Sequence, residues 1–310
     1  MMINISPRQL EVFATVAATG SVRAAAEAVH LSQPAVSMAL AELERLLGQR
    51  VFDRAGRRLT LNEHGMALLP RAQEVLERMR DLPRHVTGAP AMLRGDLRVG
   101  ASNTVGNYLV GDLLGGFTRT HPGVDLHLAI ANTEAIVEDV RRFAVDVGCV
   151  EGAVPHADVD MLPWREDRLV VCVRPDHPLA RRRRLAAKDF KDVRWILRER
   201  GSATRALAER ALSRLPPAAG VLELGQSEAI KQAVIAGLGI ACLPEVAIAD
   251  VRAAGKLCVL RTPFLDLRRR LTLVLHRERY RGPLLEAFLD AVLASSAQPG
   301  MRRRNALRRG

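Results

Sequence analysis

The stretch that decides the fold is SVRAAAEAVHLSQPAVSMALAELERLLGQRVFDRAGRRLTLNEHG, residues 21–65. Its apolar residues recur at helical spacing, and Ser21 and Ser32 stand where helix N-caps are expected. The pattern predicts a short helix over 22–29, a tight turn, and a second helix over 33–47. Two helices joined by so short a turn form a helix-turn-helix.

The flanking residues extend this motif in both directions. An apolar stripe around Leu10 and Phe13 predicts a helix before it, and two short extended pieces at 51–54 and 57–61 predict a β-wing after it. The next helix carries apolar residues at 4-3-4-3 spacing, which is typical of a dimerisation seam. The seam consists of Leu68, Ala72, Val75, Met79 and Leu82. Pro83 and the Gly88-Ala89-Pro90 stretch predict a hinge or linker after it.

From Gly95 onward, predicted strands alternate with predicted helices, among them a helix over 104–119 and a strand over 169–173. This alternation indicates parallel βαβ units in two lobes. The predicted fold class is therefore α+β multidomain: a winged helix-turn-helix, a linker helix and a two-lobed α/β domain. The expected boundaries are 1–61 for the winged helix-turn-helix, 62–90 for the linker or dimerisation helix, 95–297 for the two lobes and 298–310 for a basic disordered tail. Within the third unit, we expect lobe I at about 95–166 and 268–297, and lobe II at about 167–267.

Composition narrows the class of protein. With 310 residues and 48% hydrophobic residues, the chain can bury several cores, which excludes global disorder. No apolar run is long enough to span a membrane, and the N-terminus does not resemble a signal peptide, so we expect a cytoplasmic protein. The four cysteines are far apart in apolar segments and are interpreted as reduced core thiols.

The net charge of +12 makes a polyanionic partner plausible but does not locate its binding site. Residues 1–60 hold only seven basic residues against five acidic ones. We interpret the arginine runs at 181–184, 268–270 and 302–309 as solvated faces and a loose tail.

Residues 21–65 closely resemble the DNA-binding domain of LysR-type transcriptional regulators. The resemblance rests on Ala24–Ala26, Leu31-Ser32-Gln33-Pro34-Ala35-Val36-Ser37, Leu43-Glu44, Phe52-Asp53-Arg54 and Leu61-Asn62-Glu63-His64-Gly65, and continues through 201–205 and 237–244. It implies a transcription factor with a periplasmic-binding-protein-like effector domain, assembled as a homotetramer from two homodimers. The segment 100–109 looks like the branch tied to sulfur assimilation and sulfite reduction, which implies sulfite, sulfate or another oxyanion as effector.

The N-terminal end of the helix at 33–47 is the expected reader of double-stranded promoter DNA, because this end enters the major groove. Gln33 is suited to adenine, Ser37 to either kind of base pair, and Met38 to a thymine methyl. Arginines around the wing are expected to contact phosphates. The full predicted DNA-binding set is Ser21, Ser32, Gln33, Pro34, Ser37, Met38, Arg50, Arg54 and Arg57.

Polar residues at three predicted helix starts in the α/β half are the candidate effector site. Backbone N–H groups and hydroxyls at a helix start favour an anion, and ligands of two-lobed sheet folds sit at the carboxyl ends of strands. The predicted set is Ser102, Asn103, Thr104, Asn132, Thr133, Glu151, Ser202, Thr204, Arg205 and Glu228. Each hydroxyl is also open to a plain N-cap role, and the two glutamates to a role in shaping the pocket.

No sequence feature favours catalysis, a metal or a cofactor. The chain lacks a Gly-x-Ser-x-Gly elbow, a phosphate-cradling Gly-x-x-x-x-Gly-Lys-Ser/Thr loop and metal-ligand spacing of histidines or cysteines. We therefore expect a regulator and not an enzyme, with no catalytic residues, no metal and no cofactor. Two alternatives stay open: a solute-binding protein whose N-terminal helices only dimerise, and an α/β enzyme fused to a DNA-binding module.

Overall fold

The computed structural model describes residues 4–55, 58–87, 92–152 and 154–296. Its N-terminal domain contains α1 (Pro7–Thr19), α2 (Val22–Ala28), α3 (Gln33–Leu47), the wing strands β1 (Phe52–Ala55) and β2 (Arg58–Leu61), and α4 (Glu63–Thr87). Local capping sets the helix starts, as predicted. The Ser21 hydroxyl accepts the Ala24 amide at 3.4 Å, and the Ser32 hydroxyl accepts the Ala35 amide at 3.3 Å. The winged helix-turn-helix is confirmed.

Helix α4 continues through Pro83 to Thr87 and lies within the 62–90 expected for the linker or dimerisation helix. Pro83 left the length of this helix open in the sequence, and in the structure it does not end the helix. A proline inside a helix removes one hydrogen bond, and contacts outside the helix support the preceding turn. The Arg78 guanidinium lies 4.5 Å from the centre of the Tyr280 ring, and the Glu77 carboxylate pairs with Arg279 at 2.9 Å. The predicted linker at 88–90 lies outside the described residues.

The remaining elements form the α/β half of the chain. In order they are β3 (Arg94–Ser102), α5 (Asn103–Tyr108), α6 (Val110–Thr120), β4 (Gly123–Ala131), α7 (Thr133–Arg141), β5 (Val147–Glu151), β6 (Val159–Val173), β7 (Arg194–Leu197), α8 (Ala203–Leu212), β8 (Gly220–Glu223), α9 (Ser227–Ile235), β9 (Ile240–Pro244), α10 (Ala249–Ala253), β10 (Cys258–Val259), β11 (Arg268–His276) and α11 (Pro283–Ser296). Three short 3₁₀ helices among the described residues complete it: η1 (Pro178–Arg181), η2 (Ala187–Phe190) and η3 (Glu245–Ile248).

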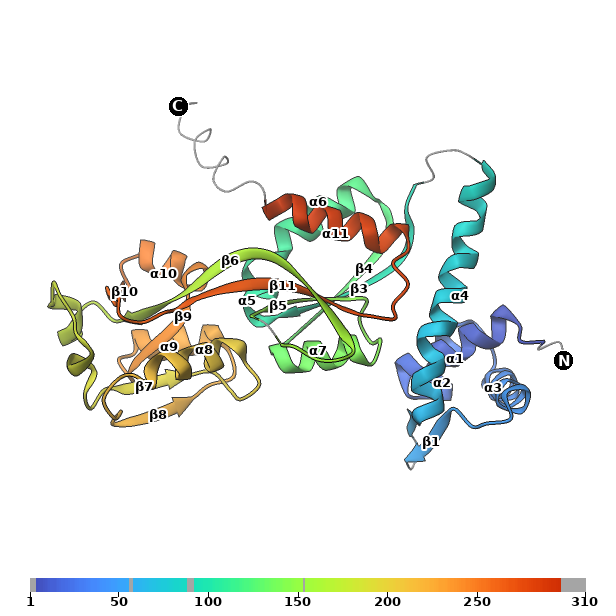
Figure 1. The fold of residues 1–310 in the computed structure, drawn as a ribbon, viewed down its shortest axis with the longest axis horizontal. Helices are drawn as coiled ribbons and strands as arrows, with labels where there is room; N and C mark the ends of the chain where they lie inside the picture. Colours follow the sequence, from blue (N-terminus) through green and yellow to red (C-terminus); the bar gives the residue numbers. More distant parts are fainter. Residues whose placement is uncertain (1–3, 56–57, 88–91, 153, 297–310) are drawn as a thin grey trace.

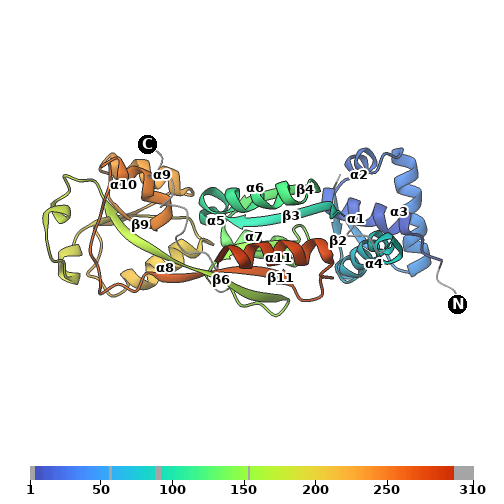
Figure 2. The ribbon, with the colours of Figure 1, turned by 90° about the horizontal axis from the view of Figure 1, so that it is seen from above.

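Among the described residues, nine strands form one sheet that runs through both lobes, in the order β4-β3-β5-β11-β6-β9-β7-β8, with β10 beside β6. Strands β3, β4 and β5 are parallel, as are β7, β8 and β9. The two long strands β6 and β11 are antiparallel to each other and cross between the lobes (Figures 1 and 2). The predicted two-lobed α/β architecture is confirmed. The crossing strands, called the hinge below, connect the two lobes.

Separate apolar cores hold the two lobes. The main core of lobe I combines residues 97–164 with residues 271–292, so the chain returns to lobe I after building lobe II. The cores of lobe II use residues within 169–267. The predicted basic tail at 298–310 lies outside the described residues.

Two predicted elements differ from the structure. The sequence indicated a strand only at 169–173, whereas β6 begins at Val159. Pro163 and the charges at 165–168 obscured its first half, which pairs with β11 through a register shift at Leu271/Thr272. The helix expected over 104–119 is two helices, because Leu109 separates α5 from α6.

Candidate DNA interface and effector site

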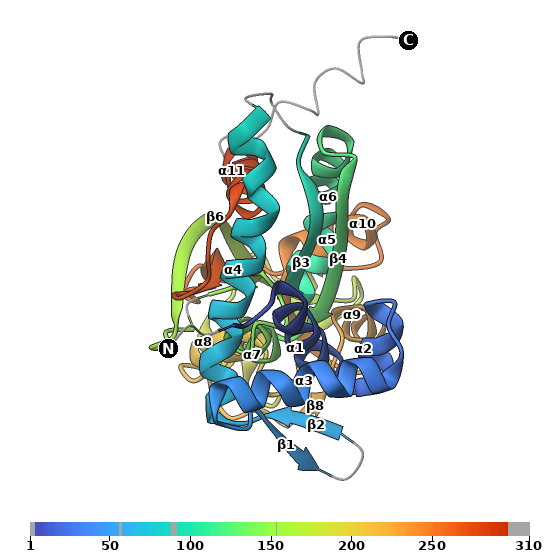
Figure 3. The same ribbon diagram turned by 90° about the vertical axis from the view of Figure 1, so that its right-hand side faces the viewer.

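Helix α3 lies on the outer face of the N-terminal domain (Figure 3), and most of its first residues are exposed. Val36, Leu40 and Leu43 bury the opposite side of the helix in the domain core. Ser32, Gln33, Pro34 and Ser37 are exposed, and Met38 is 73% exposed. This geometry leaves the predicted base-contacting side chains free to enter a groove.

The other predicted DNA contacts are only partly described. Ser21 is half-buried because its hydroxyl caps α2, and Arg50 is exposed at the start of the wing. Arg54 lies in β1, and nothing is described of its side chain. Arg57 lies outside the described residues.

The seam of α4 divides into two parts. Leu68 and Ala72 pack against the core of the N-terminal domain, so they are not available to contact a second copy of the chain. Val75, Met79 and Leu82 are 43%, 42% and 58% exposed, which leaves an apolar stripe on the second half of the helix.

Seven of the ten predicted effector residues are buried together where the lobes face each other: Ser102, Asn103, Thr104, Thr133, Glu151, Ser202 and Thr204. The Glu151 carboxylate organises the lobe I side. It accepts the Thr104 amide and the Thr133 hydroxyl, both at 3.0 Å. Burial by itself raises the pKa of Glu151, but the Arg269 guanidinium and hydrogen bonds from the side chains of Thr104, Ser102 and Thr133 outweigh it and hold the pKa below its ordinary value. The chain therefore places its own carboxylate against the donors predicted for an anion.

The remaining hydroxyls and amides of the predicted set make local contacts. Ser102 donates to the Cys149 carbonyl at 3.3 Å, and the Asn103 amide donates to the Ala131 carbonyl at 3.0 Å. Ser202 caps α8 by accepting the Arg205 amide at 3.5 Å. Asn132 caps α7 and also donates across the lobes to the Arg200 carbonyl at 3.4 Å.

Two charged residues of the predicted effector set, Arg205 and Glu228, pair with other residues of the chain. Arg205 contacts Glu209 at 2.7 Å and also pairs with Glu223, so its guanidinium is neutralised within lobe II. Glu228 is exposed and accepts the Tyr108 hydroxyl from lobe I. It also pairs with the buried Lys231 at 2.8 Å.

Arg269 is the residue of this site that the sequence analysis placed wrongly. Within the run 268–270 it is the inward residue, because successive strand residues point to opposite faces. Arg268 and Arg270 are exposed, whereas the side chain of Arg269 is only 4% exposed. The alternation of a strand was the available signal, and the density of arginines concealed it.

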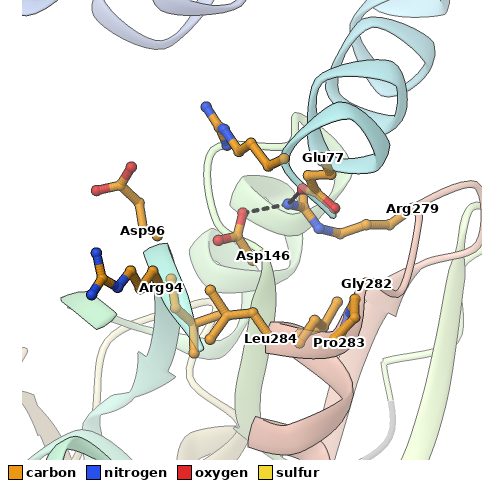
Figure 4. Close-up of a pocket in the computed structure, with 12 residues that line it drawn as sticks. Glu77, Arg94, Asp96, Asp146, Arg279, Gly282, Pro283 and Leu284 are labelled. Carbon is orange, nitrogen blue, oxygen red and sulfur yellow. Dashed lines mark hydrogen bonds and ion pairs between the residues drawn. The ribbon is translucent and has the colours of Figure 1, made fainter. Parts of the chain in front are cut away.

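A second buried cluster joins the DNA-binding half to lobe I (Figure 4). The Arg279 guanidinium contacts Asp146 at 2.7 Å and Glu77 of α4 at 2.9 Å. Asp146 also pairs with Arg98 at 2.9 Å. Burial raises the pKa of Glu77 although Arg279 opposes it. This cluster fixes the linker helix against the effector half.

Cys149, Cys172 and Cys242 are buried and Cys258 is half-buried, and all four are free in the structure. Burial raises the pKa of Cys149 and of Cys172 to about 12, and it also raises that of Cys242. These three side chains are therefore thiols and not thiolates at neutral pH. In the described part of the chain, no group of three or more His, Cys, Asp or Glu could hold a metal ion.

The exposed start of α3 is suited to enter a groove of DNA, and the two lobes of the α/β half meet at a buried polar site. Together these features define a ligand-responsive DNA-binding regulator. Residues 7–66 match the model of the bacterial regulatory helix-turn-helix protein, lysR family, and residues 90–297 match that of the LysR substrate binding domain. The chain belongs to the LysR family of transcriptional regulators.

Similar proteins agree with this assignment. The regulator YeiE of Escherichia coli K12 is 40% identical over 292 residues, which is 93% of this chain and 97% of YeiE. A full-length OxyR variant of Pseudomonas aeruginosa matches at a TM-score of 0.76 and 25% identity, covering 93% of this chain and 95% of OxyR. The regulatory domain of Synechocystis CcmR in complex with 2-PG matches at 0.61 and 29% identity, covering 66% and 98%.

These relatives are regulators, in line with the prediction of a regulator and not an enzyme. No helix of the described residues is long and apolar enough to cross a membrane.

Proposed function

We propose that this chain is a cytoplasmic regulator that reads promoter DNA with the exposed start of α3 and responds to a small oxyanion bound between its lobes. The observation that supports the DNA contact is the free surface formed by Gln33, Ser37 and Met38, beside helix residues that are buried in the core. Ser21, Ser32, Pro34, Arg50, Arg54 and Arg57 complete the proposed contact set.

Substitution of Gln33 or Ser37 by alanine tests the DNA contact. Each change is expected to weaken binding to a specific site by about 1–3 kcal/mol, because a bidentate or direct base contact is lost. The target fragments are recovered by chromatin immunoprecipitation with sequencing, and affinity is then measured by fluorescence anisotropy at a fixed salt concentration.

The exposed Gln226 of lobe II offers a matched control, since Gln226→Ala removes the same group far from α3. Equal affinities of the wild type, Gln33→Ala and Ser37→Ala for specific fragments, or equal binding of scrambled DNA, would show that α3 does not read sequence.

The effector proposal rests on the buried hydroxyls and the Arg269 guanidinium at the lobe junction. CcmR, which is similar in this domain, has been solved with 2-PG, and sulfite and sulfate share an oxyanion chemistry with it. One of these anions at a hundredfold excess over Kd should stabilise the folded chain by about 2.7 kcal/mol. Thermal shift measures this, with sodium chloride at matched ionic strength as the control. Stabilisation by an uncharged or cationic metabolite alone would contradict the oxyanion class.

We propose further that the apolar stripe of Val75, Met79 and Leu82 meets a second copy of the chain, as a first step toward a homotetramer. Met79→Glu places a carboxylate in that seam and is expected to weaken the dimer by roughly tenfold or more. Sedimentation velocity at micromolar concentration measures the shift toward monomer. Met92→Glu is the control, because Met92 is 52% exposed and lies outside α4. If the two variants showed the same fraction of monomer, the stripe would have no role in assembly.

A further inference from the structure

The guanidinium of Arg269 connects both lobes to the hinge. Its Nη2 donates to the Thr104 hydroxyl of lobe I at 3.2 Å, and its Nη1 donates to the Thr204 hydroxyl of lobe II at 2.9 Å. Its Nε donates to Asp167 at 2.7 Å, and Asp167 is its register partner on β6. One side chain on a crossing strand thereby contacts each lobe and the opposite crossing strand.

The hydrogen bonds between Arg269 and the two threonines do not use all the donors of this cluster. Both threonine hydroxyls act as acceptors toward Arg269, so each can also donate its own proton. The Thr104 hydroxyl is hydrogen-bonded to the Glu151 carboxylate, whereas no acceptor for the Thr204 hydroxyl is found among the described residues. The hydroxyl oxygens are neutral acceptors, whereas an oxyanion is a charged acceptor that binds a guanidinium more strongly. Exchange of the two hydroxyls for an oxyanion would give Arg269 a charged acceptor and would give the Thr204 hydroxyl an acceptor for its proton.

We propose that Arg269 is the specificity-determining residue of the effector site: it bridges the lobes through Thr104 and Thr204 when the site is empty, and it binds the oxyanion of the effector when the site is filled. This inference rests on the proposed function and names the group that recognises the charge. Because the Arg269 side chain is 4% exposed, the effector enters only after a contact to one of the two threonines opens. Binding and lobe movement are therefore linked through one guanidinium.

Arg269→Lys separates charge from geometry. Lysine keeps the positive charge but cannot donate in a fork to both lobes. Binding of sodium sulfite, sodium sulfate and 2-PG to the full chain, measured by calorimetry, is expected to weaken by at least about tenfold. Arg270→Lys is the matched control, because Arg270 is the next residue of β11 and is exposed on the opposite face.

A double variant, Arg269→Met with Asp167→Asn, keeps the test valid if Arg269→Lys does not fold. It removes the cation together with its paired carboxylate, so that no buried charge is left alone at that pair. Its melting temperature shows whether it folds, and its binding of the same three anions is expected to fall in the same way. Hydrogen exchange without any ligand gives an independent readout. In Arg269→Lys, amides at 103–108 and 203–208 should exchange faster, whereas Arg270→Lys leaves them unchanged.

The outcomes separate this inference from the proposed function. Binding by the wild type and by Arg270→Lys, with loss in both Arg269 variants, supports it. Binding that persists in the Arg269 variants overturns the role of Arg269 but leaves the oxyanion site standing. No binding of any of the three anions to the wild type overturns the oxyanion proposal and this inference together. Unchanged exchange at both segments in Arg269→Lys overturns the bridging of the lobes.

Discussion

Replacing Arg279 by glutamine is expected to destabilise the chain by about 1–3 kcal/mol, because the buried Asp146 carboxylate keeps only Arg98 as its cation and Glu77 loses its ion pair. The Arg279 side chain is 6% exposed and that of Asp146 is 5% exposed, so water screens their interaction little. The same guanidinium reaches Glu77 and the Gln73 amide of α4, the latter at 3.3 Å. Loss of Arg279 should therefore also release α4 from lobe I.

Chemical denaturation measures the loss of stability, and hydrogen exchange along α4 measures the release. Arg281→Gln is a suitable comparison two residues away, since Arg281 pairs with Asp160 at 3.0 Å with 33% and 40% of the side chains exposed. An exposed pair of this kind contributes about 1 kcal/mol at most. If Arg279→Gln were no more destabilising than Arg281→Gln, the cluster at the junction would not hold the two halves together.

Phe143→Ala is expected to cost about 3–5 kcal/mol through the cavity that it leaves. Phe143 follows α7 in lobe I, is 4% exposed, and belongs to the same apolar cluster as Phe13 and Leu69 of the N-terminal domain. Its ring centre lies 4.2 Å from that of His276 at the end of β11. The ring therefore fills a gap between the two halves of the chain. Its loss should lower the free energy of unfolding and weaken the contact between the N-terminal domain and lobe I.

The backbone at Phe143 permits a second comparison. Its φ is 56°, in the left-handed region that costs a residue with a Cβ about 1–2 kcal/mol. Phe143→Gly removes the ring but relieves this strain, so it should be no less stable than Phe143→Ala. Urea denaturation of the two variants beside Phe143→Leu, which keeps most of the apolar volume, checks both claims. A wild-type midpoint for Phe143→Ala would mean that the ring carries no packing energy.

Much of the candidate DNA interface could be predicted because its determinants are local. Ser21 and Ser32 cap the helices that follow them, and the apolar positions of α3 are spaced for one buried face. The side chains left over, Gln33, Ser37 and Met38, are then exposed by elimination. No distant residue had to be known.

The effector site was predictable only in part. The sequence predicted Thr104, Thr133, Glu151 and Thr204 for this site, and the fold brings them together from four separate segments. It did not predict that Glu151 would accept the donors offered to an anion, nor that Arg269 would join the two threonines. Those contacts depend on β11 returning beside β5 and β6, a pairing between residues that are far apart in the sequence.

The amino-acid sequence alone determined the helix-turn-helix, the α/β alternation and the family, because caps, turns and periodicity act over a few neighbouring residues. The tertiary structure alone decided which arginine of the run 268–270 is buried, how far α4 continues past Pro83, and that Phe143 and Arg279 join the two halves. Each of these depends on which distant surface covers a residue, and burial changes the free energy of a charge or a ring far more than local propensity does.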